Sequence, residues 1–108
     1  IDRYLALQRA DMPDFSLIMM FGRLLCLMGE YEKARKHFTH LLKTTEEDKA
    51  SLYHNLGLVD ASQQKFSAAL ENYGIAQILL HEAVPPRRQE LATTLNNMAA
   101  VFSKVTDE

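Results

Sequence analysis

Residues 53–73, Tyr-His-Asn-Leu-Gly-Leu-Val-Asp-Ala-Ser-Gln-Gln-Lys-Phe-Ser-Ala-Ala-Leu-Glu-Asn-Tyr, decide the fold. Four positions of this stretch have counterparts 35 residues earlier, a spacing given by 57 − 22, 64 − 29, 69 − 34 and 73 − 38. The pairs are Gly22 with Gly57, Gly29 with Gln64, Ala34 with Ala69, and Phe38 with Tyr73. Three of the four pairs keep the residue type. A repeat of this length indicates a protein built from stacked copies of one supersecondary unit.

Apolar residues within the first unit recur every three or four positions, at Ile18, Phe21, Leu25 and Met28 and then at Tyr31, Ala34, Phe38 and Leu41. This is the period of an amphipathic α-helix, so each unit is predicted to contain two helices. Gly29 separates the first pair because glycine readily takes the positive φ that ends a helix, and Gln64 is predicted to do the same without glycine. The pattern predicts helices at residues 2–9, 14–28, 31–44, 48–63, 66–83 and 88–105, and no strands.

A third copy of the front half follows at a longer spacing. Leu95-x-x-Met98-Ala99 repeats Tyr53-x-x-Leu56-Gly57 at 42 residues (99 − 57), which is seven more than the first period. We assign the seven extra residues to a longer fifth helix, with a longer loop before Pro85 as the alternative. The predicted map is a preceding helix in 1–13, repeat 1 in 15–49, a lengthened repeat 2 in 50–91, and the first helix of a third repeat in 92–108. This last helix lacks a partner, so we expect an excerpt of a longer array.

Small residues recur where two helices of a unit must approach closely. On the first helices, these small residues are Gly22, Gly57 and Ala99, whose side chains leave room for the second helix. The large residues Phe38 and Tyr73 are predicted to fill the groove toward the next unit. Each apolar face is then completed only by its neighbour.

This pattern resembles the tetratricopeptide repeat (TPR), W-x2-L-G-x2-Y…A-x3-F…P. The resemblance covers residues 15–108 and implies an all-α fold, a right-handed superhelix of antiparallel helix pairs. The longer second period and residues 91–99 also resemble the repeats of kinesin light chain and related cargo adaptors. One departure is Asp60, which stands where the family has an aromatic residue. It is either a paired buried carboxylate or a loosened contact, and we expect a polar partner or partial exposure.

Composition narrows the classes of partner. The 12 basic and 14 acidic side chains give a net charge of −2, which supplies no drive toward nucleic acid or an anionic membrane. The most apolar stretch, residues 15–28, is shorter than the roughly 20 residues of a membrane span and contains Arg23. The single cysteine, Cys26, favours a reducing, cytoplasmic setting. No signal peptide is recognised.

Few residues suggest catalysis or metal binding. His37 and His40 share a helix face, but no Asp, Glu or Cys nearby completes a zinc site, so we predict surface histidines. Cys26 and His54 are a conceivable nucleophile and base, yet no third group to orient them is evident. Arg87 and Arg88 are assigned to a solvated helix start. We therefore predict no enzymatic activity, no metal and no cofactor.

The resemblance implies that the first helix of each repeat lines a concave groove. The groove candidates are Arg23, His54, Asn55, Leu58, Asn96, Asn97 and Lys104. Asn55 and Asn97 share one repeat position, and an asparagine carries both a donor and an acceptor for a peptide backbone. Met20 interrupts that ladder in the first repeat, and a structural role for the asparagines is the alternative. Paired lysines and asparagines grip a terminal carboxylate in chaperone-tail TPRs, but Met19 and Leu58 stand at two of those positions, so that ligand is disfavoured.

The predicted function is a non-catalytic protein-binding scaffold or adaptor that holds an extended peptide or partner segment in this groove. The alternative is a regulatory or targeting arm of a larger multidomain protein, including an enzymatic one. Self-association is a third hypothesis, because Met98, Val101, Phe102 and Val105 lack a covering second helix.

Overall fold

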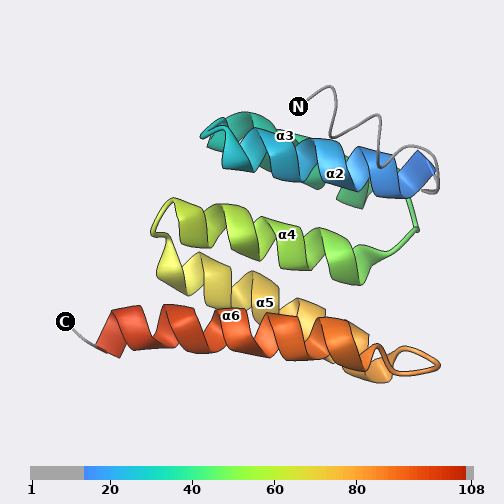
Figure 1. Cartoon of the computed structure of the whole chain (residues 1–108). Coiled ribbons are helices and arrows are strands. Elements are labelled where there is room, and N and C mark those ends of the chain that lie inside the picture. The colour runs from blue at the N-terminus through green and yellow to red at the C-terminus, as the bar shows by residue number, and fades with distance from the viewer. Residues whose placement is uncertain (1–13, 107–108) are drawn as a thin grey trace.

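The computed structural model describes residues 14–106, and these residues are almost entirely helical (Figure 1). The helices are α2 (Asp14–Leu27), α3 (Tyr31–Thr44), α4 (Lys49–Ser62), α5 (Phe66–Glu82) and α6 (Arg88–Thr106). Within this range there is no strand, so the predicted all-α class is confirmed. The helix predicted at residues 2–9 lies outside the described residues. None of the described helices is long and apolar enough to cross a membrane.

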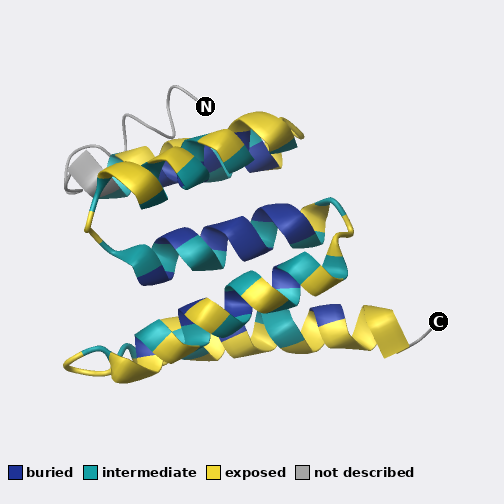
Figure 2. Ribbon diagram, turned by 180° about the vertical axis from the view of Figure 1, so that it is seen from behind, coloured by how far each residue is buried: buried dark blue, intermediate teal, exposed yellow. Residues whose placement is uncertain are grey.

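The helices form a stack in chain order. α2 lies beside α3, α4 beside α5, and α6 runs along α5, while α3 also packs on α4 and so joins the first pair to the second (Figure 1). α4 carries the most buried residues, as its dark colour in Figure 2 shows. One core cluster crosses three helices and contains Met19, Cys26, Ala34, Phe38, Leu52, Leu56 and Val59. The apolar face of the first pair is therefore completed by α4, as predicted.

Two glycines set the approach of the paired helices. A Cβ atom added to Gly57 would lie 2.5 Å from Cδ1 of Tyr73, and one added to Gly22 would collide with the ring of Phe38. Both rings are almost fully buried. The predicted combination of small and large residues is thus confirmed for Gly22 with Phe38 and for Gly57 with Tyr73, with the correction that each ring also packs onto the glycine of its own helix pair. Ala99, the third small residue of the prediction, is exposed.

The two turns between paired helices use the same backbone conformation. Gly29 has φ of +82° and Gln64, its repeat equivalent, has φ of +61°. Glycine takes this left-handed region without a steric penalty, whereas a residue with a Cβ pays roughly 1–2 kcal/mol. The predicted role of Gln64 is therefore confirmed, and it is the strained member of the pair.

The seven extra residues of the second repeat are not all in the fifth helix. α5 has 17 residues against 14 in α3, which accounts for three of them. The connection 83–87 is one residue longer than 45–48, and α6 begins 11 residues before Ala99 (99 − 88), whereas α4 begins eight before Gly57 (57 − 49). The assignment to the fifth helix alone was wrong. α5 ends at Glu82 because the prolines at 85 and 86 offer no amide hydrogen to extend it.

Asp60 is a paired buried carboxylate. Its side chain is 1% exposed, Nη1 of Arg35 donates to its Oδ1 at 2.5 Å, and Nδ2 of Asn72 donates to its Oδ2 at 2.7 Å. Arg35 also donates to Oε1 of Gln63. The expected polar partner is confirmed, and the network ties α3 to α4 and α5.

The last helix is only partly uncovered. Val101 is buried and Met98 packs beside it on Ala69 and Tyr73 of α5. Phe102 and Val105 remain 58% and 47% exposed. Two of the four apolar residues named for self-association are therefore occupied within the chain.

Candidate functional site

A polar hollow of about 170 Å³ lies between the first helices of the three units. α2, α4 and α6 supply every lining residue except one from α5. The lining residues are Arg23, Ala50, Ser51, His54, Asn55, Leu80, Glu90, Thr93 and Thr94.

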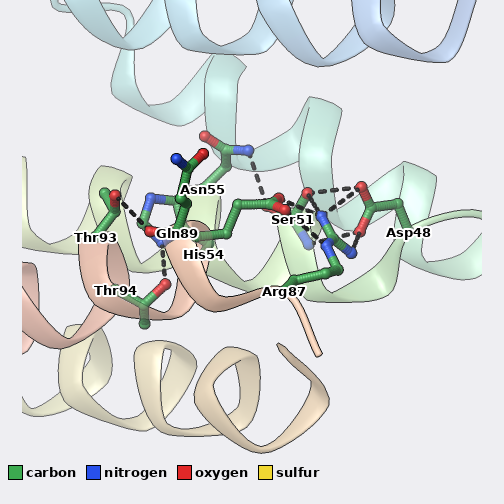
Figure 3. Close-up of polar contacts among 9 residues, drawn as sticks. Asp48, Ser51, His54, Asn55, Arg87, Gln89, Thr93 and Thr94 are labelled. Carbon is green, nitrogen blue, oxygen red and sulfur yellow. Dashed lines mark hydrogen bonds and ion pairs between the residues drawn. The ribbon is translucent and has the colours of Figure 1, made fainter. Parts of the chain in front are cut away.

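His54 lines this polar hollow from α4. Its Nδ1 is 2.9 Å from Oγ1 of Thr94, a hydrogen bond that joins α4 to α6 (Figure 3). Burial lowers the pKa of His54 below its usual 6.5, the positive charge of Arg23 lowers it further, and the carboxylate of Glu90 opposes both. The hollow thus presents a cation at Arg23, a carboxylate at Glu90, and a histidine that is a weaker base than usual.

The lowered pKa of His54 predicts a stability loss in mild acid. Because the folded state holds this proton more weakly, the unfolded chain binds more protons between the folded pKa and 6.5. The contribution of His54 to the free energy of unfolding is fully present above pH 6.5, and it declines as the pH falls from 6.5 toward the folded-state pKa. We expect the free energy of unfolding in urea, measured from pH 7.5 to 5.0, to fall less steeply for His54→Gln than for the unmodified chain.

His40 is the matched control, since its side chain is exposed on α3. His40→Gln should leave the pH slope as it is in the unmodified chain. Identical slopes for His54→Gln and His40→Gln would contradict the prediction.

Asn55 carries a buried acceptor without a partner. The residue is 2% exposed, and its Nδ2 donates to the Ser51 carbonyl oxygen at 2.8 Å. That carbonyl only accepts, so the orientation of the amide is fixed. Among the described residues nothing donates to Oδ1 of Asn55. An unpaired buried acceptor costs about 1–3 kcal/mol, so it calls for an explanation beyond packing.

Arg87 bonds to two residues that line the polar hollow, Ser51 and Glu90. Its Nη1 donates to Oδ1 of Asp48 at 2.7 Å and its Nη2 donates to Oγ of Ser51 at 3.1 Å (Figure 3). Its Nε donates to Oε1 of Glu90 at 2.8 Å. The start of α6 is thereby fixed to the start of α4. The expected solvated helix start holds for Arg88, which is exposed, but was wrong for Arg87.

Asp48 caps α4 at the same junction. It adopts a left-handed conformation with φ of 35°, and its side chain accepts from the Ser51 backbone amide at 3.1 Å. Burial raises the pKa of Asp48, but the hydrogen bonds from Arg87 and Ser51 together hold it below its usual value.

A second hollow of about 300 Å³ adjoins the polar one, and Arg23 lines both. We call it the apolar hollow because most of the side chains that line it are apolar. Its lining residues are Met20, Arg23, Leu24, Cys26, Leu27, Tyr31, Leu58 and Ser62. The Cys26 thiol is 3.7 Å from Oγ of Ser62. Cys26 and His54, which we considered as a nucleophile and base, line different hollows.

Six of the seven predicted groove residues fall into three groups. Arg23, His54 and Asn55 meet in the polar hollow, and Leu58 lines the apolar one. Asn96 and Lys104 are exposed on α6 and line neither hollow.

Asn97 has a different environment from Asn55, although both share one repeat position. Burial raises the pKa of Tyr73 to about 12, and a side-chain hydrogen bond from Asn97 opposes that rise. Asn97 therefore lies beside the Tyr73 side chain of α5 and lines neither hollow.

The sequence did not point to the α6 residues of the polar hollow, Glu90, Thr93 and Thr94. The 42-residue spacing aligns Thr94 with Leu52 (94 − 52) and Val101 with Val59 (101 − 59), and all four are buried. That alignment could have placed Thr94 on the inner face of α6.

The two histidines of α3, His37 and His40, have different environments. Nε2 of His37 lies 2.7 Å from the Ile18 carbonyl oxygen and links α3 to α2, so the predicted surface position holds only for His40. Across residues 14–106, no three His, Cys, Asp or Glu side chains gather in a metal-binding arrangement.

Comparison with family models, with curated proteins and with solved structures gives no match to this chain. The TPR resemblance therefore rests on the internal repeat alone.

Proposed function

We propose that the protein is a non-catalytic scaffold of the TPR kind, a right-handed superhelix that binds an extended peptide or partner segment along α2, α4 and α6. The observation that carries this proposal is the polar hollow, to which the first helix of every unit contributes. A surface assembled from equivalent faces of successive units suits a ligand that extends along the stack.

The polar groups of the hollow also favour a peptide. A peptide offers an N–H donor at each residue other than proline, and Oδ1 of Asn55 is an acceptor with no donor among the described residues. This oxygen has almost no exposed surface, so we expect a small movement of the surrounding side chains on binding.

Binding suits these side chains better than catalysis. A general base of the serine- or cysteine-hydrolase type is oriented by a third group and lies within reach of a nucleophile. His54 is bonded instead to the Thr94 hydroxyl, and the Cys26 thiol lines the other hollow. The adaptor role and the cytoplasmic location belong to the same proposal, supported by the repeat pattern and the single cysteine.

Filling the polar hollow should weaken peptide binding. Peptides that bind the whole chain are first selected from a displayed random library, and their affinities are then measured by calorimetry. Thr93→Trp places a large ring in a hollow of about 170 Å³ and is expected to weaken binding by about tenfold or more, equivalent to 1.4 kcal/mol.

Ala92→Trp is the matched control, because Ala92 is the exposed neighbour of Thr93 on α6 and lines neither hollow. The control should bind as the unmodified chain does. Equal affinities for both variants would contradict the proposed groove, as would a library from which no peptide is enriched.

A further inference from the structure

The outer face of α3 is basic. This helix contains four Lys and Arg residues and one Glu, which give it a net charge of +3 (4 − 1). Four exposed side chains, spaced three, four and three positions apart, lie along one of its faces. They are Lys33, Lys36, His40 and Lys43, and we call them the basic stripe. The charge of α3 is therefore directed away from the core.

The outer face of α5 has the opposite charge and an apolar centre. This helix contains two Glu residues and neither Lys nor Arg, which gives it a net charge of −2. Four exposed side chains, spaced four, three and four positions apart, lie along one of its faces. They are Glu71, Ile75, Ile78 and Glu82, and we call them the acidic stripe. The two isoleucines are 38% and 57% exposed, with a carboxylate one turn away on each side.

The two stripes occupy equivalent positions of successive units. The 35-residue period pairs Lys36 with Glu71, His40 with Ile75, and Lys43 with Ile78 (71 − 36, 75 − 40 and 78 − 43). α3 and α5 are the second helices of their units, run in the same direction and lie on one side of the stack, behind α2 and α6 in Figure 1. One side of the molecule thus carries a basic and an acidic stripe in matching register.

A second copy of the chain supplies the complement of both stripes at once. A two-fold axis parallel to the helices, midway between α3 and α5, would place α3 of each copy against α5 of the other. This rotation keeps every position at its height along the helices. Lys36 of one copy would therefore meet Glu71 of the other. Lys43 would lie over Ile78 and reach toward Glu82, one turn beyond.

We propose that the protein forms a two-fold symmetric dimer in which the basic stripe of each copy packs on the acidic stripe of the other. Each charge pair occurs twice, and opposite charges fix the register of the two copies. The hydrocarbon parts of the lysine side chains cover the exposed isoleucines while their ammonium groups reach the carboxylates. Helices of 14 and 17 residues are only about 21 and 26 Å long, so the interface is small and the dimer is weak and reversible.

The dimer adds to the proposed binding function without using the same surface. No residue of either stripe lines the polar or the apolar hollow. Both copies would therefore keep their hollows open, and one assembly would present two binding grooves. A partner with two binding segments would then be held more tightly than by one copy, because its second contact is intramolecular.

Exchange of charges between the stripes tests this dimer. One variant combines Lys36→Glu with Lys43→Glu, and the other combines Glu71→Lys with Glu82→Lys. In sedimentation experiments from about 10 μM to 1 mM, the unmodified chain should dimerise with increasing concentration. Each variant alone should stay monomeric, because its two stripes then repel those of a second copy. An equimolar mixture should dimerise again, because two acidic stripes then meet two basic ones.

Salt and the last helix provide the controls. Raising NaCl from about 0.05 to 0.5 M should weaken dimerisation of the unmodified chain by about tenfold, since salt screens exposed charges. Phe102→Ser alters the exposed apolar face of α6 and should leave dimerisation unchanged. Helicity by circular dichroism confirms that each variant is folded.

Three results would overturn the proposal. The first is an unmodified chain that stays monomeric at the highest concentration. The second is a charge-exchanged variant that dimerises alone as strongly as the unmodified chain, or a mixture of the two variants that stays monomeric. The third is loss of the dimer in Phe102→Ser, which would place the interface on α6 instead. None of these results bears on peptide binding, which is measured separately.

Discussion

Replacing Arg35 by leucine is expected to destabilise the fold by about 3–5 kcal/mol, the usual cost of leaving one partner of a buried ion pair behind. Asp60 is only 1% exposed, so water cannot take the place of the guanidinium. Asn72 would remain as a donor to Oδ2 of Asp60, but it carries no charge. Chemical unfolding in urea at pH 7, followed by circular dichroism, measures the loss.

Lys33 provides the matched control on the same helix. It pairs with Glu30 at 3.7 Å, and the two side chains are 71% and 48% exposed. A pair of this kind contributes about 0–1 kcal/mol, so Lys33→Leu should have little effect. The combination of Arg35→Leu with Asp60→Asn should recover part of the loss, because it removes the unpaired buried charge. Equal costs for Arg35→Leu and Lys33→Leu would refute this account of Asp60.

The Asp60 network also explains a departure from the repeat pattern. A carboxylate at an aromatic position is acceptable only where donors from two other helices reach it, and Arg35 of α3 and Asn72 of α5 do so. We predicted a polar partner for Asp60 from the sequence because burying a carboxylate without one costs free energy. The sequence did not identify the partner, since the choice depends on how the helices are placed relative to one another.

The helices themselves were predictable to within a residue or two. Their apolar residues recur at three and four positions over two or more turns, and the turns at Gly29 and Gln64 are local. The lengthened repeat was less predictable. A spacing gives the number of extra residues, but it does not say how a helix end, a turn and the next helix share them.

The candidate site was predictable only where repeat position alone decides the environment. Arg23, His54 and Asn55 were found in this way and line one hollow. Asn97 has the same repeat position as Asn55, but its side chain lies beside Tyr73 instead. Repeat position fixes the helix face, while the neighbouring helix decides what that face meets.

The junction of Arg87 and Asp48 could not have been predicted from local pattern. The two residues are 39 positions apart, and nothing in the spacing pairs them. Their contact depends on the turn after α5, which brings the start of α6 beside the start of α4 (Figure 3).

Gly57→Ala is expected to destabilise the fold even though alanine is the better helix former. In the interior of α4, this change alone should gain roughly 0.8–1 kcal/mol from helix propensity. The added Cβ would, however, lie 2.5 Å from Cδ1 and 2.6 Å from Cε1 of Tyr73. Those atoms belong to a rigid ring that is 1% exposed, so α4 and α5 must move apart. We expect a net loss of about 1–3 kcal/mol, and a larger one for Gly57→Leu.

Gly74 isolates the steric contribution, because it lies inside α5 and an added Cβ there meets no heavy atom within 4 Å. Gly74→Ala should therefore stabilise the protein by about 0.5–1 kcal/mol, opposite in sign to Gly57→Ala. Urea unfolding of the two variants at one pH gives both values, and stabilisation by both substitutions would show that the helices do not approach at Gly57. Combining Gly57→Ala with Tyr73→Leu should cost less than the sum of the two single changes, since removing the ring removes the clash. The fold would then depend on the pairing of a small with a large residue, which is what makes the repeat recognisable in the sequence.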